Sequence, residues 1–262
     1  MDLQLAGQHV LITGGSKGIG LACARAFCNE GASVSLVARD EAALEQAHRD
    51  LERSGGKVRT FSADLRDASS AATIVERAES DGGPIDVLVN SSGAAVRTPF
   101  DELSPQAWRA AMDAKFFTYV NVMDPVIKRM GARGRGAVVN VIGAGGKVAS
   151  PTHLAGGAAN AGLMLATAGL ASAYGPRGVR VNAVNPGPTM TARLEQGLAA
   201  EARLQNKSPD DVLASHRQRI PLQRLATPEE VANAVLFLAS TSASYITGAI
   251  VAMDGGVSPI VV

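Results

Sequence analysis

A glycine-rich turn is the first group of residues whose types and spacing can do chemistry. It lies directly between the apolar run 9–13 and a helical pattern. Glycines let a backbone approach a pyrophosphate closely, and a helix N-terminus offers free N–H groups and a positive dipole end. This succession predicts a dinucleotide site, the alternative being a glycine-rich turn without a ligand. The residues assigned to the site are Gly14, Ser16, Lys17, Gly18, Ile19 and Gly20.

Charges at the end of the second apolar run distinguish two nicotinamide dinucleotides. An acid there would bind the ribose 2′-hydroxyl of NAD(H) and repel the 2′-phosphate of NADP(H). Ala38 stands at the expected acid position, and Arg39 follows with a guanidinium suited to phosphate. Lys17 adds a second cation, while Asp40 fits the N-cap of the next helix. These residues predict NADP(H), unless Arg39 is simply a solvated helix-start residue.

The elements that must position this turn alternate along the whole chain of 262 residues. Near-continuous apolar runs, typical of strands buried on both faces, alternate with helical patterns. This predicts an α/β fold in a single domain, 1–262, with a doubly wound, Rossmann-type parallel sheet of about seven strands. The expected strands are 9–13, 33–38, 58–62, 87–90, 137–141, 180–184 and 249–253, and the expected helices are about 18–30, 40–53, 67–80, 104–130, 153–174 and 228–239.

The polar, charged segment 189–222 lies between the last two expected strands. A long insertion beyond the carboxyl end of a strand lies over the ligand crevice in this class of sheet. We therefore expect 189–222 to form a substrate lid.

Composition argues against several classes of function. The net charge of +1 disfavours nucleic acid or an anionic membrane as the main partner. Residues 153–176 carry no formal charge, but they are mainly small, which indicates a buried helix and not a membrane span. The histidines lack metal-ligand spacing, so no metal is expected. Without a signal-peptide profile, and with Cys23 and Cys28 interpreted as core residues of a reducing compartment, the protein is expected to be cytoplasmic.

Six motifs in sequence order resemble those of the short-chain dehydrogenase/reductase family, and they span nearly the whole chain. They are the 13–20 turn, Ala63-Asp64-Leu65, Asn90-Ser91-Ser92-Gly93, Arg180-Val181-Asn182-Ala183-Val184-Asn185-Pro186-Gly187, Tyr245-Ile246-Thr247-Gly248 and Asp254-Gly255-Gly256. The further residues that the resemblance implies at the cofactor, from the adenine to the nicotinamide, are Asp64, Leu65, Asn90, Gly93, Pro186, Gly187 and Thr189.

The resemblance also implies a reaction centre of four side chains. In the family a Ser polarises the carbonyl, a Tyr donates the proton, a Lys lowers the pKa of that Tyr and holds the ribose, and an Asn anchors a water relay. The residues at these positions, in that order, are Gly143, Gly156, Asn160 and Lys115. Hydride delivery to a ketone creates an alkoxide that needs a proton and an oxyanion partner, and glycine supplies neither. We therefore expect an intact cofactor site beside a substituted reaction centre.

Three residues are candidates to replace the missing groups. Lys115 and Asn160 look exchanged relative to the family pattern, and an ammonium from the opposite helix would hold the ribose or an oxyanion. The alternative is a solvated or surface-paired lysine. His153 precedes Asn160 by seven residues, the separation that the enoyl-reductase branch uses in Tyr-x6-Lys, and an imidazole donates protons near neutral pH. The alternative is a helix-start histidine hydrogen-bonded to backbone.

Three functions remain compatible with these features. The first is an NADP(H)-dependent oxidoreductase acting on a small carbonyl or activated C=C substrate at a non-standard active site. The second is a catalytically inactive NADP(H)-binding subunit or sensor, and the third is a cofactor-assisted isomerase or lyase. The resemblance and the small residues along 153–174 also imply contacts with other subunits, so we expect a homotetramer, with a dimer as the alternative.

Overall fold

One parallel sheet organises the chain in the computed structural model, which describes residues 2–93, 95–192, 194–195, 198–199, 202 and 206–258. Within these residues seven strands pair in the order β3-β2-β1-β4-β5-β6-β7. The order reverses between β1 and β4, which is where open α/β sheets bind ligands. The strands are β1 (His9–Thr13), β2 (Ser33–Ala38), β3 (Lys57–Ser62), β4 (Val87–Asn90), β5 (Gly136–Val141), β6 (Val179–Pro186) and β7 (Ile250–Met253).

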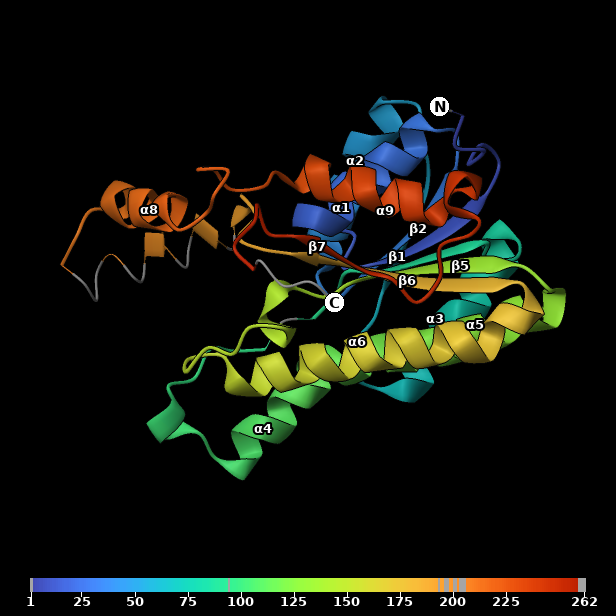
Figure 1. The fold of residues 1–262 in the computed structure, drawn as a ribbon. Helices are drawn as coiled ribbons and strands as arrows, with labels where there is room; N and C mark the ends of the chain where they lie inside the picture. The colour runs from blue at the N-terminus through green and yellow to red at the C-terminus, as the bar shows by residue number, and fades with distance from the viewer. Residues whose placement is uncertain are drawn as a thin grey trace.

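Helices cover both faces of this sheet, with α1, α2 and α9 on one face and α3, α5 and α6 on the other (Figure 1). The predicted doubly wound, Rossmann-type fold is therefore confirmed. The helices discussed below are α1 (Gly18–Asn29), α2 (Glu41–Arg53), α3 (Ala68–Gly82), α4 (Pro105–Ala111), α5 (Thr118–Arg133), α6 (Leu154–Tyr174), α8 (Pro209–Gln218) and α9 (Pro228–Ala239).

The central strands are mostly apolar because both of their faces are covered. In β1, Val10 and Ile12 lie in the core beneath α1 and α9, whereas Leu11 lies in the core beneath α3 and α5. Alternate side chains of a strand point to opposite faces, so a strand between two helical layers has no position for a solvated residue.

The expected helix 104–130 is divided into three parts. A π-helical turn, η2 (Met112–Phe117), separates α4 from α5, and α5 continues to Arg133 before Gly134 ends it in the left-handed conformation. Such turns are rare and often occur at functional sites. Lys115 lies within η2.

Arg180 of the 180–187 motif has a structural role. Its guanidinium donates hydrogen bonds to the carbonyl oxygens of Leu238, Ala239 and Ser240 at 2.7, 2.9 and 3.0 Å. The last carbonyls of a helix have no partner within the helix, and here Arg180 satisfies those at the end of α9. Burial lowers the pKa of this guanidinium. Arg180 therefore ties α9 to β6.

The helix α6 is the most apolar helix of the structure's described part. The stretch Leu154–Arg177 is long and apolar enough to cross a membrane, and no other described helix is. In this fold α6 packs along β6 and η2, with Leu163 and Ala171 buried. Its outward face stays apolar, since Leu165 is 76% exposed.

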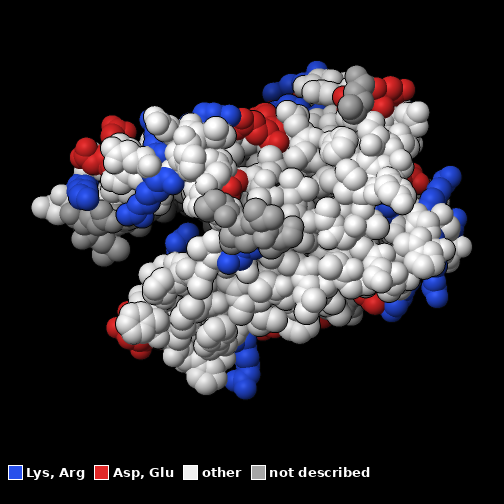
Figure 2. Space-filling model, viewed as in Figure 1, with Lys and Arg blue, Asp and Glu red and all other residues white. Residues whose placement is uncertain are grey.

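The segment 189–222 is described only in part, because residues 193, 196–197, 200–201 and 203–205 lie outside the described residues. Thr189 pairs with Ala226 in a parallel bridge, and α8 projects beyond the carboxyl end of β6 (Figure 1). Figure 2 shows a hollow between the part that carries α8 and the part that carries α4 and α6.

Candidate functional site

The glycine-rich turn brings three segments of backbone into close contact. Gly14 has φ +67°, and a Cβ there would lie 2.8 Å from the carbonyl oxygen of Ser91. A Cβ on Gly20 would overlap the carbonyl oxygen of Gly14. Lys17 is the N-cap of α1 and makes no side-chain capping bond, so the first N–H groups of the helix, from Gly18 on, stay available to an anion.

The predicted phosphate-binding cations lie beside this turn. Arg39 directly follows β2, and both Arg39 and Lys17 are exposed. Neither forms an ion pair with an acid in the described part of the chain. Asp40 accepts a hydrogen bond from the Ala43 amide at 3.1 Å, which confirms it as the N-cap of α2. Ala38 leaves the end of the strand without an acid.

The 63–65 turn is held from two sides. Arg66 Nε donates to Asp64 Oδ1 and Oδ2 at 3.0 and 2.9 Å. This hydrogen bonding holds the pKa of Asp64 below its usual value. Asn121 of α5 donates to the Leu65 carbonyl at 3.0 Å, and the Leu65 side chain is buried. The backbone of the turn is thus fixed, and contact of Asp64 and Leu65 with an adenine stays a prediction.

A chain of buried side chains crosses the carboxyl ends of the strands. Thr13 donates to Asn90 at 3.4 Å, Asn90 to Asn140 at 3.0 Å, and Asn140 to Thr167 of α6 at 3.0 Å. Sequence reasoning singled out Asn90 and not Asn140 or Thr167, although an Asn inside an apolar strand was a usable signal. A Cβ on Gly93 would lie 2.6 Å from Thr118 Oγ1, so this turn also packs against α5.

Three buried polar atoms at the same edge have no hydrogen-bond partner within the described residues. They are Ser92 Oγ after β4, Asn185 Oδ1 near the end of β6, and Asn160 Oδ1 on α6. Buried polar atoms in folded proteins are almost always paired, so a group of this kind needs an explanation, such as a ligand. Their positions trace the edge where a dinucleotide would lie.

The structure brings Gly143 and Asn160 together. A Cβ on Gly143 would lie 3.5 Å from Asn160 Nδ2 and would contact nothing else within 4 Å. The Asn160 amide therefore faces the space that a side chain at position 143 would occupy. The loop continues through η3 (Ala144–Gly146), which packs on the first turns of α6.

The His153 imidazole lies directly over Gly156. A Cβ on Gly156 would collide with His153 Cε1 and lie 2.8 Å from both ring nitrogens. On the other side, a Cβ on Gly145 would lie 2.9 Å from His153 Cδ2. His153 is the N-cap residue of α6, but its side chain makes no capping bond. The imidazole therefore occupies the space that a side chain at position 156 would fill.

Lys115 is buried, with 7% of its surface exposed. Its Nζ donates to Tyr119 Oη at 2.7 Å and to the Val141 carbonyl oxygen at 3.2 Å, and Tyr119 Oη donates to the same carbonyl. The surface-lysine alternative is therefore wrong. Sequence reasoning missed Tyr119, although the spacing of four residues from Lys115 was a signal. Burial raises the pKa of Tyr119, so its phenol stays protonated.

Pro186, Gly187 and Thr189 form the loop after β6. The Gly187 amide donates to the Met253 carbonyl at 3.0 Å, and Thr189 Oγ1 donates to the Gly187 carbonyl at 3.1 Å.

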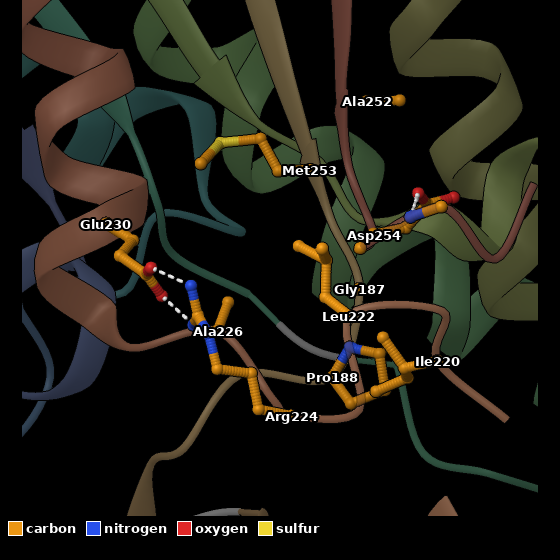
Figure 3. A pocket seen from close by; sticks show the side chains of 12 residues that line it. Gly187, Pro188, Ile220, Leu222, Arg224, Ala226, Glu230, Ala252, Met253 and Asp254 are labelled. Atoms are coloured by element: carbon orange, nitrogen blue, oxygen red, sulfur yellow. Dashed lines mark hydrogen bonds and ion pairs between the residues drawn. The ribbon is translucent and has the colours of Figure 1, made fainter. Parts of the chain in front are cut away.

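Behind this loop lies a cavity of about 340 Å³, with an ion pair between Arg224 and Glu230 on its wall (Figure 3). The candidate catalytic residues do not line it, so it is separate from the space around His153.

Comparisons with known proteins agree with this geometry. A family model described as enoyl-(acyl carrier protein) reductase matches residues 14–258. The chain is 37% identical over 257 residues to cis-4-hydroxycyclohexanecarboxylate dehydrogenase of Sinomonas cyclohexanicum, with 98% of each chain covered. L-sorbose reductase of Gluconobacter frateurii, complexed with NADPH and L-sorbose, matches with a TM-score of 0.93 and 29% identity over 100% of both chains.

A further solved structure matches nearly the whole chain. It is an NADPH-bound short-chain oxidoreductase of Pseudomonas aeruginosa PAO1 whose description states that it contains an atypical catalytic center. It matches with a TM-score of 0.88 and 30% identity, over 98% of this chain and 100% of that chain. Together with the six motifs, the fold and the family model, these matches show that the chain belongs to the short-chain dehydrogenase/reductase family of oxidoreductases.

Proposed function

We propose that the protein is an NADP(H)-dependent oxidoreductase that transfers hydride to or from a small carbonyl or activated C=C substrate at a rebuilt reaction centre. The observation that carries this proposal is the His153 imidazole over Gly156, the position that the motifs match to the family's proton-donating Tyr. The Pseudomonas aeruginosa relative supports it, because that protein combines bound NADPH with an atypical catalytic center.

The residues present fit NADP(H). The N-terminus of α1 and its glycine turn suit the pyrophosphate, and Arg39 and Lys17 suit the 2′-phosphate because both are exposed and neither forms an ion pair with a described acid. The unpaired oxygens of Ser92, Asn160 and Asn185 suit the hydroxyl and amide groups at the nicotinamide end. The nicotinamide supplies or accepts the hydride when the cofactor is bound.

The chain's own residues would handle the proton and the developing negative charge. In the reducing direction His153 would donate a proton to the substrate, and in the oxidising direction it would accept one. Asn160 Nδ2, which faces the open space beside Gly143, would donate a hydrogen bond to a developing oxyanion. Lys115 would act one step away, because its ammonium holds the carbonyl of Val141, two residues before Gly143.

Activated alkenes suit this reaction centre as well as ketones do. Reduction of an enone produces an enolate, which is far less basic than an alkoxide and depends less on a strong local acid. The centre offers one imidazole and one amide where the family uses a hydroxyl and a phenol.

Turnover measurements test the proposal. NADPH oxidation should be followed with a panel of aldehydes, ketones and enones, and His153→Phe should lower kcat by about 10²- to 10⁴-fold. NADPH affinity should not change in that variant. His48→Phe is the matched control, since His48 lies on α2 and pairs with Glu52. Full turnover by His153→Phe would remove His153 from the mechanism.

The glycines at positions 143 and 156 favour a second candidate, a non-catalytic NADP(H)-binding subunit or sensor. Tight NADPH binding without turnover of any carbonyl or enone would establish it. Product formation without a net change in nicotinamide absorbance would instead indicate an isomerase or lyase.

We infer that the protein assembles as a homotetramer, or failing that a dimer, through the apolar surface of α4, η2 and α6. Leu165 is 76% exposed on α6, and Phe117 and Trp108 are 41% and 39% exposed on the neighbouring elements. Light scattering on the purified protein measures the assembly directly.

We also propose that the 189–222 segment acts as a substrate lid over the hollow in Figure 2.

A further inference from the structure

The loops after β4, β5 and β6 contain no acidic residue. No Asp or Glu occurs between Asp86 and Asp101, or between Asp124 and Glu195. These two stretches include the loops at the carboxyl ends of β4, β5 and β6, the three strands that surround the candidate reaction centre. The chain has almost equal numbers of acidic and basic residues, yet none of its carboxylates lies on these loops.

Two cations lie on those loops. Arg97 follows β4, and Lys147 follows η3. Neither forms an ion pair with an acid in the described parts of the chain, while Asp101 and Glu102 are exposed on the next element, η1 (Phe100–Glu102). Each cation has an exposed valine beside it, since Val96 is 80% and Val148 is 46% exposed.

Both cations lie close in sequence to residues that contact the turn around His153. The Thr98 amide, next to Arg97, donates to the carbonyl of Thr152 at 3.1 Å. Lys147 lies two residues after Gly145, whose Cβ position is 2.9 Å from the His153 ring. Figure 2 shows Lys and Arg side chains on the border of the hollow, and the acidic side chains visible below it lie at the outer end and underside.

We propose that the substrate is a monoanion, a carboxylate on a small apolar skeleton that also bears the reacting carbonyl or hydroxyl group. Lys147 and Arg97 bind the carboxylate, Val96 and Val148 contact the skeleton, and the reacting carbon then lies toward His153. The acid-free loops make this favourable, because none of the three presents a like charge to the anion. This substrate class rests on the proposed function and specifies it further.

Two other acids close to the site have partners of their own. Asp254 accepts hydrogen bonds from the amides of Gly256 and Ser258, both at 3.0 Å, and so is turned to its own loop. Glu230 is paired with Arg224, on the wall of the separate cavity.

The test compares 4-oxocyclohexanecarboxylate with its methyl ester, which differ in charge and little in shape. In reduction the ketone gains one hydride from NADPH and one proton, forming a secondary alcohol and NADP⁺. We expect kcat/KM for the acid to exceed that for the ester by at least about tenfold, as for a charge-assisted contact. Lys147→Gln and Arg97→Gln should each lower this acid-to-ester ratio about 3- to 10-fold. Lys57→Gln, on an exposed lysine at the start of β3, is the control.

A binding measurement keeps this test independent of turnover. Calorimetry of the NADP⁺-loaded protein should show that the acid binds more tightly than the ester, and the Lys147→Gln, Arg97→Gln double variant should abolish the difference. Turnover without charge selectivity would overturn this proposal alone. Charge-selective binding without turnover would uphold it and overturn the proposed function. If the acid and the ester give equal kcat/KM values and equal affinities, the proposal of a monoanionic substrate is wrong, whether or not the protein shows turnover.

Discussion

A methyl group added to α6 separates the role of His153 from the stability of the helix. In Gly156→Ala the new Cβ would collide with His153 Cε1 and lie 2.8 Å from both ring nitrogens, so the ring must move. A forced change of rotamer costs about 0.5–1.5 kcal/mol, while Ala stabilises a helix by about 1 kcal/mol relative to Gly. The free energy of unfolding should thus change by less than about 1 kcal/mol. A proton donor displaced by about 1 Å should lower kcat about 10²-fold.

Gly169→Ala is the matched control on the same helix. A Cβ at Gly169 meets nothing within 4 Å, so this variant should gain up to about 1 kcal/mol of unfolding free energy and keep its turnover. Urea unfolding, steady-state kinetics and light scattering should be measured on both variants. A Gly156→Ala protein with full kcat would refute the assignment of His153 as proton donor, because its imidazole cannot remain where it is.

Two further predictions concern stability. Arg180→Gln removes charge-assisted hydrogen bonds to the carbonyls at the end of α9 and should lower the unfolding free energy in urea by roughly 2–4 kcal/mol. The control variant Arg177→Gln, on an exposed arginine, should change the unfolding free energy little. Equal effects of the two substitutions would contradict the contact between α9 and β6 through Arg180. Burial lowers the pKa of His9, whose ring contacts the Gly83 carbonyl and the Ser35 hydroxyl. The unfolded chain therefore binds a proton that the folded chain does not, so His9 should reduce stability as the pH falls through about 6.5, and His9→Gln should weaken this dependence in urea unfolding at pH 5 to 7.

The order of the elements could be predicted from the sequence because most strands are covered on both faces. The bounds of β1, β2 and β4 agree with the apolar runs, since a strand between two helical layers admits no solvated residue. The end of α5 was missed because the expected helix stopped at 130, whereas Gly134 in the left-handed conformation sets the true end. The π-helical turn at Lys115 depends on contacts with β5 and α6, which no local pattern contains.

The candidate site was predictable in its composition and less so in its contacts. The position of His153 over Gly156 follows from a spacing of three residues at the start of a helix, so the sequence already placed them on one face. The Val141 carbonyl was not predictable as a partner of Lys115, because the two meet only through tertiary packing, whereas the spacing of four residues to Tyr119 was a local signal that was missed. The unpaired atom of Asn185 was also missed, since its motif did not distinguish it from the structural Arg180.

A calorimetric titration with NADPH and NADH tests the central claim most directly. The account predicts that the purified protein binds NADPH at least about tenfold more tightly than NADH, through Arg39 and Lys17 beside the glycine turn. Arg39→Gln should remove most of that preference, because Ala38 leaves no acid to favour NADH. If neither dinucleotide associates with the protein, or if both bind equally before and after the substitution, the account is contradicted.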